Sequence, residues 1–218
     1  MAFSNLFTAG GVVMWPLLGF SILAVALIIE RVVFWVKITK RQNRVVREVL
    51  QLYRLDNVVG ALDKLQQNTD LPIARIFLAA LELEEPTPEE FRLALESEAQ
   101  AEIPLIKRFQ NIFDTIIGLA PLLGLLGTVL GLIISFASLD APGDLGGEKT
   151  RNVTGGISQA LVSTAAGLIV AIFTLFFANS FRGLYMRQIA WIQEYGGQLE
   201  LLYRRRYERG EKSYAPTR

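Results

Sequence analysis

Hydroxyl and amide side chains inside two long apolar stretches are the residues of this chain that could do chemistry. The stretches, 115–139 and 152–181, contain no charged side chain. The polar residues that stand out in them are Thr128, Ser135, Gln159, Ser163 and Thr164. Hydroxyls both donate and accept hydrogen bonds, so this set could line a path for an ion. A structural interpretation stays open beside it, in which the hydroxyls bond back to their own helix and the amide bonds to a neighbouring one.

The ionisable groups that usually accompany such chemistry are missing from both stretches. The chain has no His and no Cys, which excludes thiol nucleophiles, His-containing triads and Cys or His metal sites. Neither stretch contains Asp or Glu, and Asp114 stands at the edge of the first, where we expect it to be interfacial. A membrane proton carrier usually needs an acid held by polar partners. The sequence therefore indicates that the acid comes from a second subunit, and it disfavours an enzyme because no base could activate Ser135 or Ser163.

Three apolar segments predict an all-α integral membrane protein with three transmembrane helices. A helix needs about 20 apolar residues to cross a bilayer, and the segments 10–36, 112–139 and 152–181 reach that length. The first is expected to remain uncleaved, because it lacks the positive start of a signal peptide. Small residues recur every three or four positions in the second and third spans, which lets helix backbones approach closely in lipid. The glycines of this pattern are Gly124, Gly127, Gly131, Gly156 and Gly167.

The charges that flank the spans predict that the N-terminus lies outside and the C-terminus inside. Residues 31–54 carry seven basic side chains against the single acid Glu48, so this flank is cytoplasmic by the positive-inside rule. Glu30 and Arg31 are expected to form an interfacial charge pair at that end of the first span. The parts outside the spans are then a cytoplasmic helical loop at 37–111, a periplasmic loop at 140–151 and a cytoplasmic helical tail at 182–218.

The cytoplasmic parts have a helical pattern. Apolar residues three and four apart predict helices over 56–66 and 72–84, and the run 87–90, Thr-Pro-Glu-Glu, predicts a helix start with a capping box. From there we expect one long helix, bent at Pro104, that becomes the second span. The third span should continue as a helix past Arg182. Helices projecting from the membrane need neighbours to bury their apolar stripes, which favours an oligomer.

Segments in all three predicted spans resemble a known family. Residues 120–129, APLLGLLGTV, resemble the APLLGLLGTVxG motif of the ExbB/TolQ family, relatives of the flagellar stator subunit MotA. Residues 157–168, ISQALVSTAAGL, are similar to the third-span motif of that family, and residues 14–18, MWPLL, followed by Glu30-Arg31 are similar to its first. The family commonly has Glu where this chain has Gln159, and an amide cannot take up or release a proton near neutral pH.

The resemblance implies an ion-driven motor subunit of the bacterial inner (plasma) membrane. It implies a homopentamer around a pair of single-span ExbD/TolR-like subunits, with an Asp of that inner partner carrying the proton. Thr128 and Thr164 would be the pore hydroxyls that face the Asp, and the glycines would keep the pore wall smooth. The transmembrane proton gradient would drive the process, with no cofactor.

Several roles fit this resemblance. We expect an ExbB-like subunit that couples the proton motive force to periplasmic or outer-membrane work, as in TonB-dependent import, with membrane lipids and a TonB-like protein as further partners and no nucleic acid. The alternatives are a TolQ-like subunit for envelope maintenance and a non-conducting membrane scaffold. Sodium remains an alternative to the proton. A MotA-type stator is disfavoured, because that branch has four spans where this chain has three.

Overall fold

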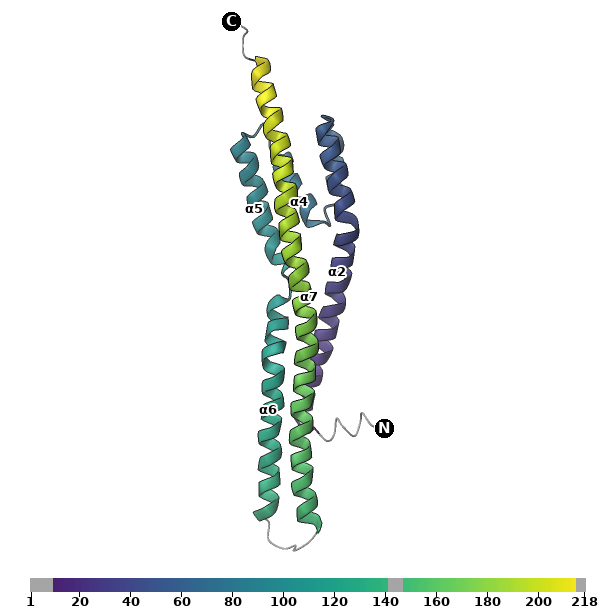
Figure 1. The fold of residues 1–218 in the computed structure, drawn as a ribbon, viewed down its shortest axis with the longest axis vertical. Helices are drawn as coiled ribbons and strands as arrows, with labels where there is room; N and C mark the ends of the chain where they lie inside the picture. The colour runs from purple at the N-terminus through teal and green to yellow at the C-terminus, as the bar shows by residue number, and fades with distance from the viewer. Residues whose placement is uncertain (1–9, 141–146, 215–218) are drawn as a thin grey trace. The chain divides into compact units, whose positions relative to one another are not determined.

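The structure is a computed structural model that describes residues 10–140 and 147–214, and within these ranges its regular secondary structure is helical (Figure 1). Its helices are α2 (Met14–Arg54), α3 (Val58–Gln66), α4 (Pro72–Leu81), α5 (Pro88–Ile106), α6 (Gln110–Asp140) and α7 (Gly147–Tyr214). Three helical regions are long and apolar enough to cross a membrane, namely Met14–Arg54, Pro88–Ser138 and Lys149–Gly210. The all-α membrane class with three candidate spans is therefore confirmed, whereas the orientation of the spans stays a prediction.

The chain divides into two units, which we name by their composition. The apolar unit comprises Met1–Arg31 and Phe109–Phe181, and the polar unit comprises Val32–Arg108 and Arg182–Arg218. Part of the predicted periplasmic loop, residues 141–146, lies outside the described residues. The described remainder of that loop is helical, because α6 continues to Asp140 and α7 already begins at Gly147.

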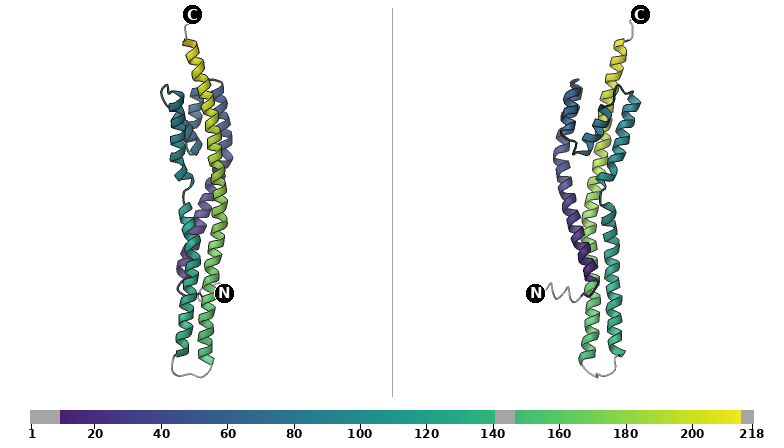
Figure 2. Two further views of the ribbon diagram at one scale, coloured as in Figure 1. Left: turned by 60° about the vertical axis from the view of Figure 1, so that its left-hand side comes forward. Right: turned by 180° about the vertical axis from the view of Figure 1, so that it is seen from behind.

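In the apolar unit, α6 lies side by side with the first half of α7 (Figures 1 and 2). The start of α2 packs on this pair through a cluster of four buried residues: Val13, Leu17, Ala120 and Ala171. Helix α2 begins only at Met14, four residues into the predicted span, because Gly11 adopts a φ of 70° that ends helical geometry on its N-terminal side. Alanines at the centre of the cluster leave little volume between the three helices.

In the polar unit, α3, α4 and α5 are short helices whose ends follow local sequence signals. Thr87 caps α5 by accepting from the Glu90 amide, and the Glu90 carboxylate accepts in return from the Thr87 amide at 2.7 Å, as the capping-box pattern predicts. The ring of Phe91 stacks on Tyr203 of α7 with centroids 4.1 Å apart. Deeper in this unit Gln42 and Gln188, both almost fully buried, exchange two amide hydrogen bonds of 3.2 and 2.7 Å.

The predicted long helix bent at Pro104 is wrong in its detail. The structure keeps Pro104 inside α5, ends that helix at Ile106 and starts α6 at Gln110, with Phe109 at a φ of 69°. Proline lacks an amide hydrogen and so removes one bond of the helical ladder, and α5 ends two residues after Pro104. The chain instead breaks where a residue takes the left-handed conformation, which a continuous right-handed helix cannot contain.

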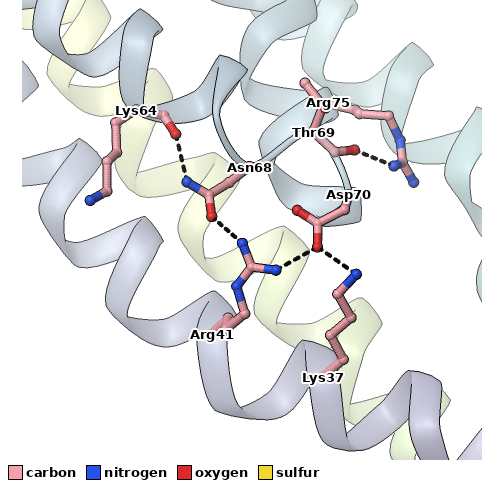
Figure 3. Close-up of polar contacts among 7 residues, drawn as sticks. All are labelled: Lys37, Arg41, Lys64, Asn68, Thr69, Asp70 and Arg75. Carbon is pink, nitrogen blue, oxygen red and sulfur yellow. Dashed lines mark hydrogen bonds and ion pairs between the residues drawn. The ribbon is translucent and has the colours of Figure 1, made fainter.

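A network of ion pairs joins α2 to the turn between α3 and α4 (Figure 3). The Asp70 carboxylate lies 3.0 Å from the Lys37 ammonium and 2.7 Å from the Arg41 guanidinium. Arg41 also donates to the side-chain oxygen of Asn68 at 2.7 Å. Nearby, Arg75 donates to the Thr69 carbonyl and pairs with the buried carboxylate of Glu102. The polar unit is thus held together partly by charges whose partners come from distant parts of the chain.

Replacing Thr87 with Ala should loosen the first turn of α5. Loss of an N-cap hydroxyl costs about 1 kcal/mol, which corresponds to roughly fivefold faster opening of the amides it protects. Hydrogen exchange followed by mass spectrometry should show faster exchange at residues 89–91. Ser97→Ala, in the middle of the same helix, should leave this exchange unchanged, and equal effects of both variants would contradict the capping role.

The stability contribution of Asp70 should depend on pH. Burial alone would raise the pKa of Asp70, but the hydrogen bond from Lys37 and the charges of Arg41 and Lys37 outweigh it, and the pKa lies below its ordinary value. A carboxyl group with a lowered pKa stabilises the folded chain at pH values above its ordinary pKa. This contribution is lost as the pH falls through the lowered pKa.

Asp70→Asn should therefore reduce thermal stability at pH 5 to 8, by no more than about 1 kcal/mol for a partly exposed pair. The difference from the wild type should shrink below about pH 4. Melting curves between pH 7 and 3 would measure it, and a difference that stays constant on acidification would refute the assignment.

Candidate functional site

The contact between α6 and α7 is made by glycines from both helices, and we call it the glycine seam: Gly124, Gly127, Gly131, Gly156 and Gly167. A Cβ added at Gly131 would lie 2.6 Å from the Gly156 carbonyl oxygen, and one at Gly167 would lie 2.5 Å from the Ala120 carbonyl oxygen. At Gly124 the nearest atoms are backbone atoms of residues 163 and 164. The two helices thus meet backbone to backbone, and they run antiparallel, since higher numbers on one match lower numbers on the other.

Ser135 and Ser163 are buried within the glycine seam. The Ser135 hydroxyl lies 3.0 Å from the Gly131 carbonyl of its own helix and 3.1 Å from the Val153 carbonyl of α7. The Ser163 hydroxyl donates to the Ala160 carbonyl at 2.9 Å. A Cβ at Gly127 would collide with Ser163, and one at Gly156 would collide with Ser135. Both serines therefore fill space that the glycines leave open, which agrees with the structural interpretation of these hydroxyls.

Thr128 and Thr164 lie on one edge of the seam. The Thr164 hydroxyl donates across to the Gly124 carbonyl at 3.0 Å, and the Thr128 hydroxyl donates to Leu125 of its own helix at 2.6 Å. Thr128 follows Gly124 by four residues, which places it one turn along α6 on nearly the same face, about 6 Å away along the axis. Both side chains are half-buried. Each hydroxyl therefore commits its proton to a carbonyl and keeps oxygen lone pairs for a further donor or cation.

Gln159 is not brought to the two threonines. It precedes Thr164 by five residues, about 140° around α7, and its amide lies directly against Gly11, where any side chain at position 11 would meet it. The structure thus places Gln159 beside the start of α2, away from Thr128 and Thr164. A part for Gln159 in an ion path stays a prediction.

The charged residues at the ends of the spans take different environments. Arg31 is 3% exposed, pairs with the neighbouring Glu30 at 2.6 and 2.9 Å, and lies over the Phe109 ring with 5.3 Å to its centroid. Asp114 is exposed and accepts from Gln110 at 3.4 Å. The Arg31 charge is thus enclosed by the protein, an arrangement that sequence reasoning missed because it depends on where Phe109 lies.

Thr174, a further polar residue of the third span, is fully buried in α7 and donates to the Val170 carbonyl at 2.7 Å. The turn at Gly11 was missed from the sequence. Gly11 is required by its positive φ and by the contact with Gln159, and the pair Gly10-Gly11 was the available signal for this turn. Within residues 10–140 and 147–214, no group of three His, Cys, Asp or Glu could hold a metal ion.

These features define a class: an α-helical membrane protein with three candidate spans, two of which pack through glycines and present hydroxyls along one edge. The chain belongs to the MotA/TolQ/ExbB proton channel family, whose model matches residues 68–194. The match contains α6 and the part of α7 that forms the seam. This is a family of channels, in agreement with the expectation that the chain is not an enzyme.

Named relatives agree with the family. The chain is 62% identical to the putative biopolymer transport protein ExbB-like 3 of Synechocystis sp., over 96% of this chain and all of that protein. It is 42% identical to ExbB-like 1 of Synechocystis sp., over 91% of this chain and 78% of that protein. A shorter match, 45% identical over 35% of this chain and 49% of the relative, is to the biopolymer transport protein ExbB of Aquifex aeolicus.

Substituting Gly131 with Ala should destabilise the glycine seam. The added Cβ meets the Gly156 carbonyl and the Ala160 side chain, neither of which can rotate away, so we expect a loss of about 1–3 kcal/mol. Thermal unfolding in a mild detergent would measure it. Gly118→Ala is the matched control on α6, because nothing lies within 4 Å of its Cβ position, and it should be neutral or slightly stabilising. Equal melting temperatures for Gly131→Ala and the wild type would mean that the helices do not pack this closely.

Proposed function

We propose that this chain is the ring-forming subunit of an ion-driven membrane motor, with a single-span ExbD/TolR-like subunit inside the ring. The observation that carries the proposal is the pair Thr128 and Thr164, which share one edge of the glycine seam with their hydroxyl protons turned to backbone carbonyls. Such hydroxyls present only oxygen lone pairs outward. They are suited to accept from a protonated carboxyl group or to solvate a cation.

The partner follows from what the seam lacks. Among the described residues of 115–139 and 152–181 no acid is available to carry a proton through the membrane. A buried acid is tolerated where polar groups meet it, and Thr128 and Thr164 are such groups. An Asp on a central helix would pass the threonine edges of a homopentamer one after another. At these edges it would take up a proton and then release it. The proton gradient serves as the energy source, and sodium is the alternative ion.

The work delivered is mechanical in this proposal. One charge moving down a membrane potential yields about 2.3 kcal/mol per 100 mV, so several ions are needed for each large step. Helices packed through glycines present a smooth surface past which an inner pair can turn. We place the complex in the bacterial inner membrane and its output at the periplasm or outer membrane, through a TonB-like protein in an ExbB-like role or through envelope maintenance in a TolQ-like role. The names of the relatives favour the ExbB-like role.

Removing the Thr164 hydroxyl should abolish most ion flux. The chain would be co-expressed with a single-span, Asp-bearing ExbD/TolR-like partner, purified and reconstituted into liposomes for proton-flux measurements. Thr164→Val and Thr128→Val keep the side-chain shape and remove an acceptor for a charged or strongly polar group, which is worth about 1.5–3 kcal/mol. We therefore expect at least tenfold slower flux in each variant.

The matched control is Thr115→Val. The Thr115 hydroxyl, like that of Thr128, bonds back to its own helix, but it lies on an exposed face near the start of α6. It should conduct within about twofold of the wild type, since no acceptor on the proposed path is lost. Native mass determination should show several copies of the chain around the partner. A stable assembly that conducts nothing would favour the scaffold alternative, and unchanged flux in both seam variants would remove the threonines from the path.

A further inference from the structure

A cationic groove lies in the polar unit between α2 and the end of α3. Its volume is about 370 Å³, near the lower end of the range for small-molecule sites. It is lined by Lys40, Arg41, Arg44, Val45, Glu48, Lys64 and Asn68. Figure 3 shows three of these residues: Arg41 on α2, Lys64 near the end of α3 and Asn68 in the turn that follows. Four lining side chains are cations and one is a carboxylate, so the groove is strongly positive.

Two of the cations are held in place by the protein. Arg41 donates to Asp70 and to Asn68, each at 2.7 Å, and Asn68 in turn donates to the Lys64 carbonyl at 2.9 Å. The Lys64 ammonium lies 2.6 Å from the Glu48 carboxylate. A guanidinium has five N–H donors, so Arg41 keeps donors for a ligand while its position is fixed. This side of the groove is preorganised.

The other two cations lack such neutralisation. Lys40 and Arg44 are exposed, stand four residues apart on α2, and have no acidic partner among the residues that the structure describes. Like charges at this spacing repel each other and destabilise a helix. The pair Lys37 and Arg41 has the same spacing, but Asp70 bridges it. The charges of Lys40 and Arg44 are therefore not balanced by an acidic side chain of the described residues.

The place of these residues along α2 indicates which kind of anion would fit beside them. Val36 ends the predicted first span, and a helix rises 1.5 Å per residue, so Lys40 and Arg44 follow the span end by about 6 and 12 Å. The polar headgroup layer of a bilayer adds roughly 5–8 Å on each side of the hydrocarbon core. Lys40 thus reaches the depth of the lipid phosphates, with Arg44 just beyond. We propose that this groove binds the phosphate of an anionic phospholipid headgroup at the leaflet where α2 leaves the membrane.

The proposal explains why Lys40 and Arg44 have no acidic partner among the described residues, whereas Lys37 and Arg41 share Asp70. Arg and Lys bind phosphate oxygens through charge-assisted hydrogen bonds, and basic pockets beside membrane helices bind anionic headgroups. A bound phosphate would neutralise Lys40 and Arg44, as Asp70 neutralises Lys37 and Arg41. The site is independent of the proposed ion path, and its test needs no partner subunit.

The test measures lipid binding to the purified full chain. The chain would be placed in nanodiscs of phosphatidylcholine alone or with phosphatidylglycerol, and its melting temperature and the lipid retained in native mass spectra would be recorded. We expect phosphatidylglycerol to be retained and to raise the melting temperature of the wild type. The double variant Lys40→Gln/Arg44→Gln should bind it at least tenfold more weakly, because each cation near an anionic surface contributes on that scale.

The control is the double variant Arg182→Gln/Arg187→Gln, which removes two exposed cations just past the end of the third span and outside the groove. It should keep phosphatidylglycerol binding at the wild-type level. Equal losses in both double variants would mean that general surface charge attracts the lipid, and the groove would be rejected as a site. Full stabilisation of the wild type by inorganic phosphate in phosphatidylcholine nanodiscs would overturn the lipid assignment in favour of a soluble anion.

Discussion

Direct backbone contact between α6 and α7 is the interaction on which the apolar unit depends. In lipid no hydrophobic driving force brings helices together, so close packing and hydrogen bonds must do so. The glycine seam supplies both, because it lets carbonyls of one helix come within reach of hydroxyls of the other: Ser135 reaches Val153, and Thr164 reaches Gly124. A larger residue at Gly124 or Gly131 would separate the helices and remove these bonds together with the contact.

The same closeness determines what the hydroxyls can do. Ser135 and Ser163 point into the seam and are consumed by packing, whereas Thr128 and Thr164 stand at its edge. Since each threonine proton is already donated to a carbonyl, the chemistry left to that edge is acceptance. Under the proposed function it matters that these hydroxyls only accept, because an edge of acceptors stabilises the protonated, neutral form of a passing carboxyl group.

Features that rest on local patterns could be predicted from the sequence, and features that rest on the rotation of one helix against another could not. The three candidate spans and the capping box at Thr87 follow from composition and from contacts within four residues. The close approach at the glycines was also predictable, because small residues in lipid have few other uses. The side of α7 on which Gln159 lies depends on where α2 packs, and neither spacing nor composition determines that. The break at Phe109 likewise replaced the expected bend at Pro104, because it depends on one residue taking the left-handed conformation, which the helical pattern does not predict.

The basic flank of α2 shows how one sequence signal can contain two structural roles. The positive-inside rule counts Lys and Arg near a span without regard to the face on which they lie. In the folded chain Lys37 and Arg41 share Asp70, which lies 29 residues beyond Arg41 in sequence, and they therefore fasten α2 to the turn before α4. Lys40 and Arg44 have no such partner among the described residues. Topology alone would be served by cations anywhere on this flank. The groove instead holds Arg41 and Lys64 in place beside the unmatched Lys40 and Arg44, and an anion bound there accounts for this arrangement.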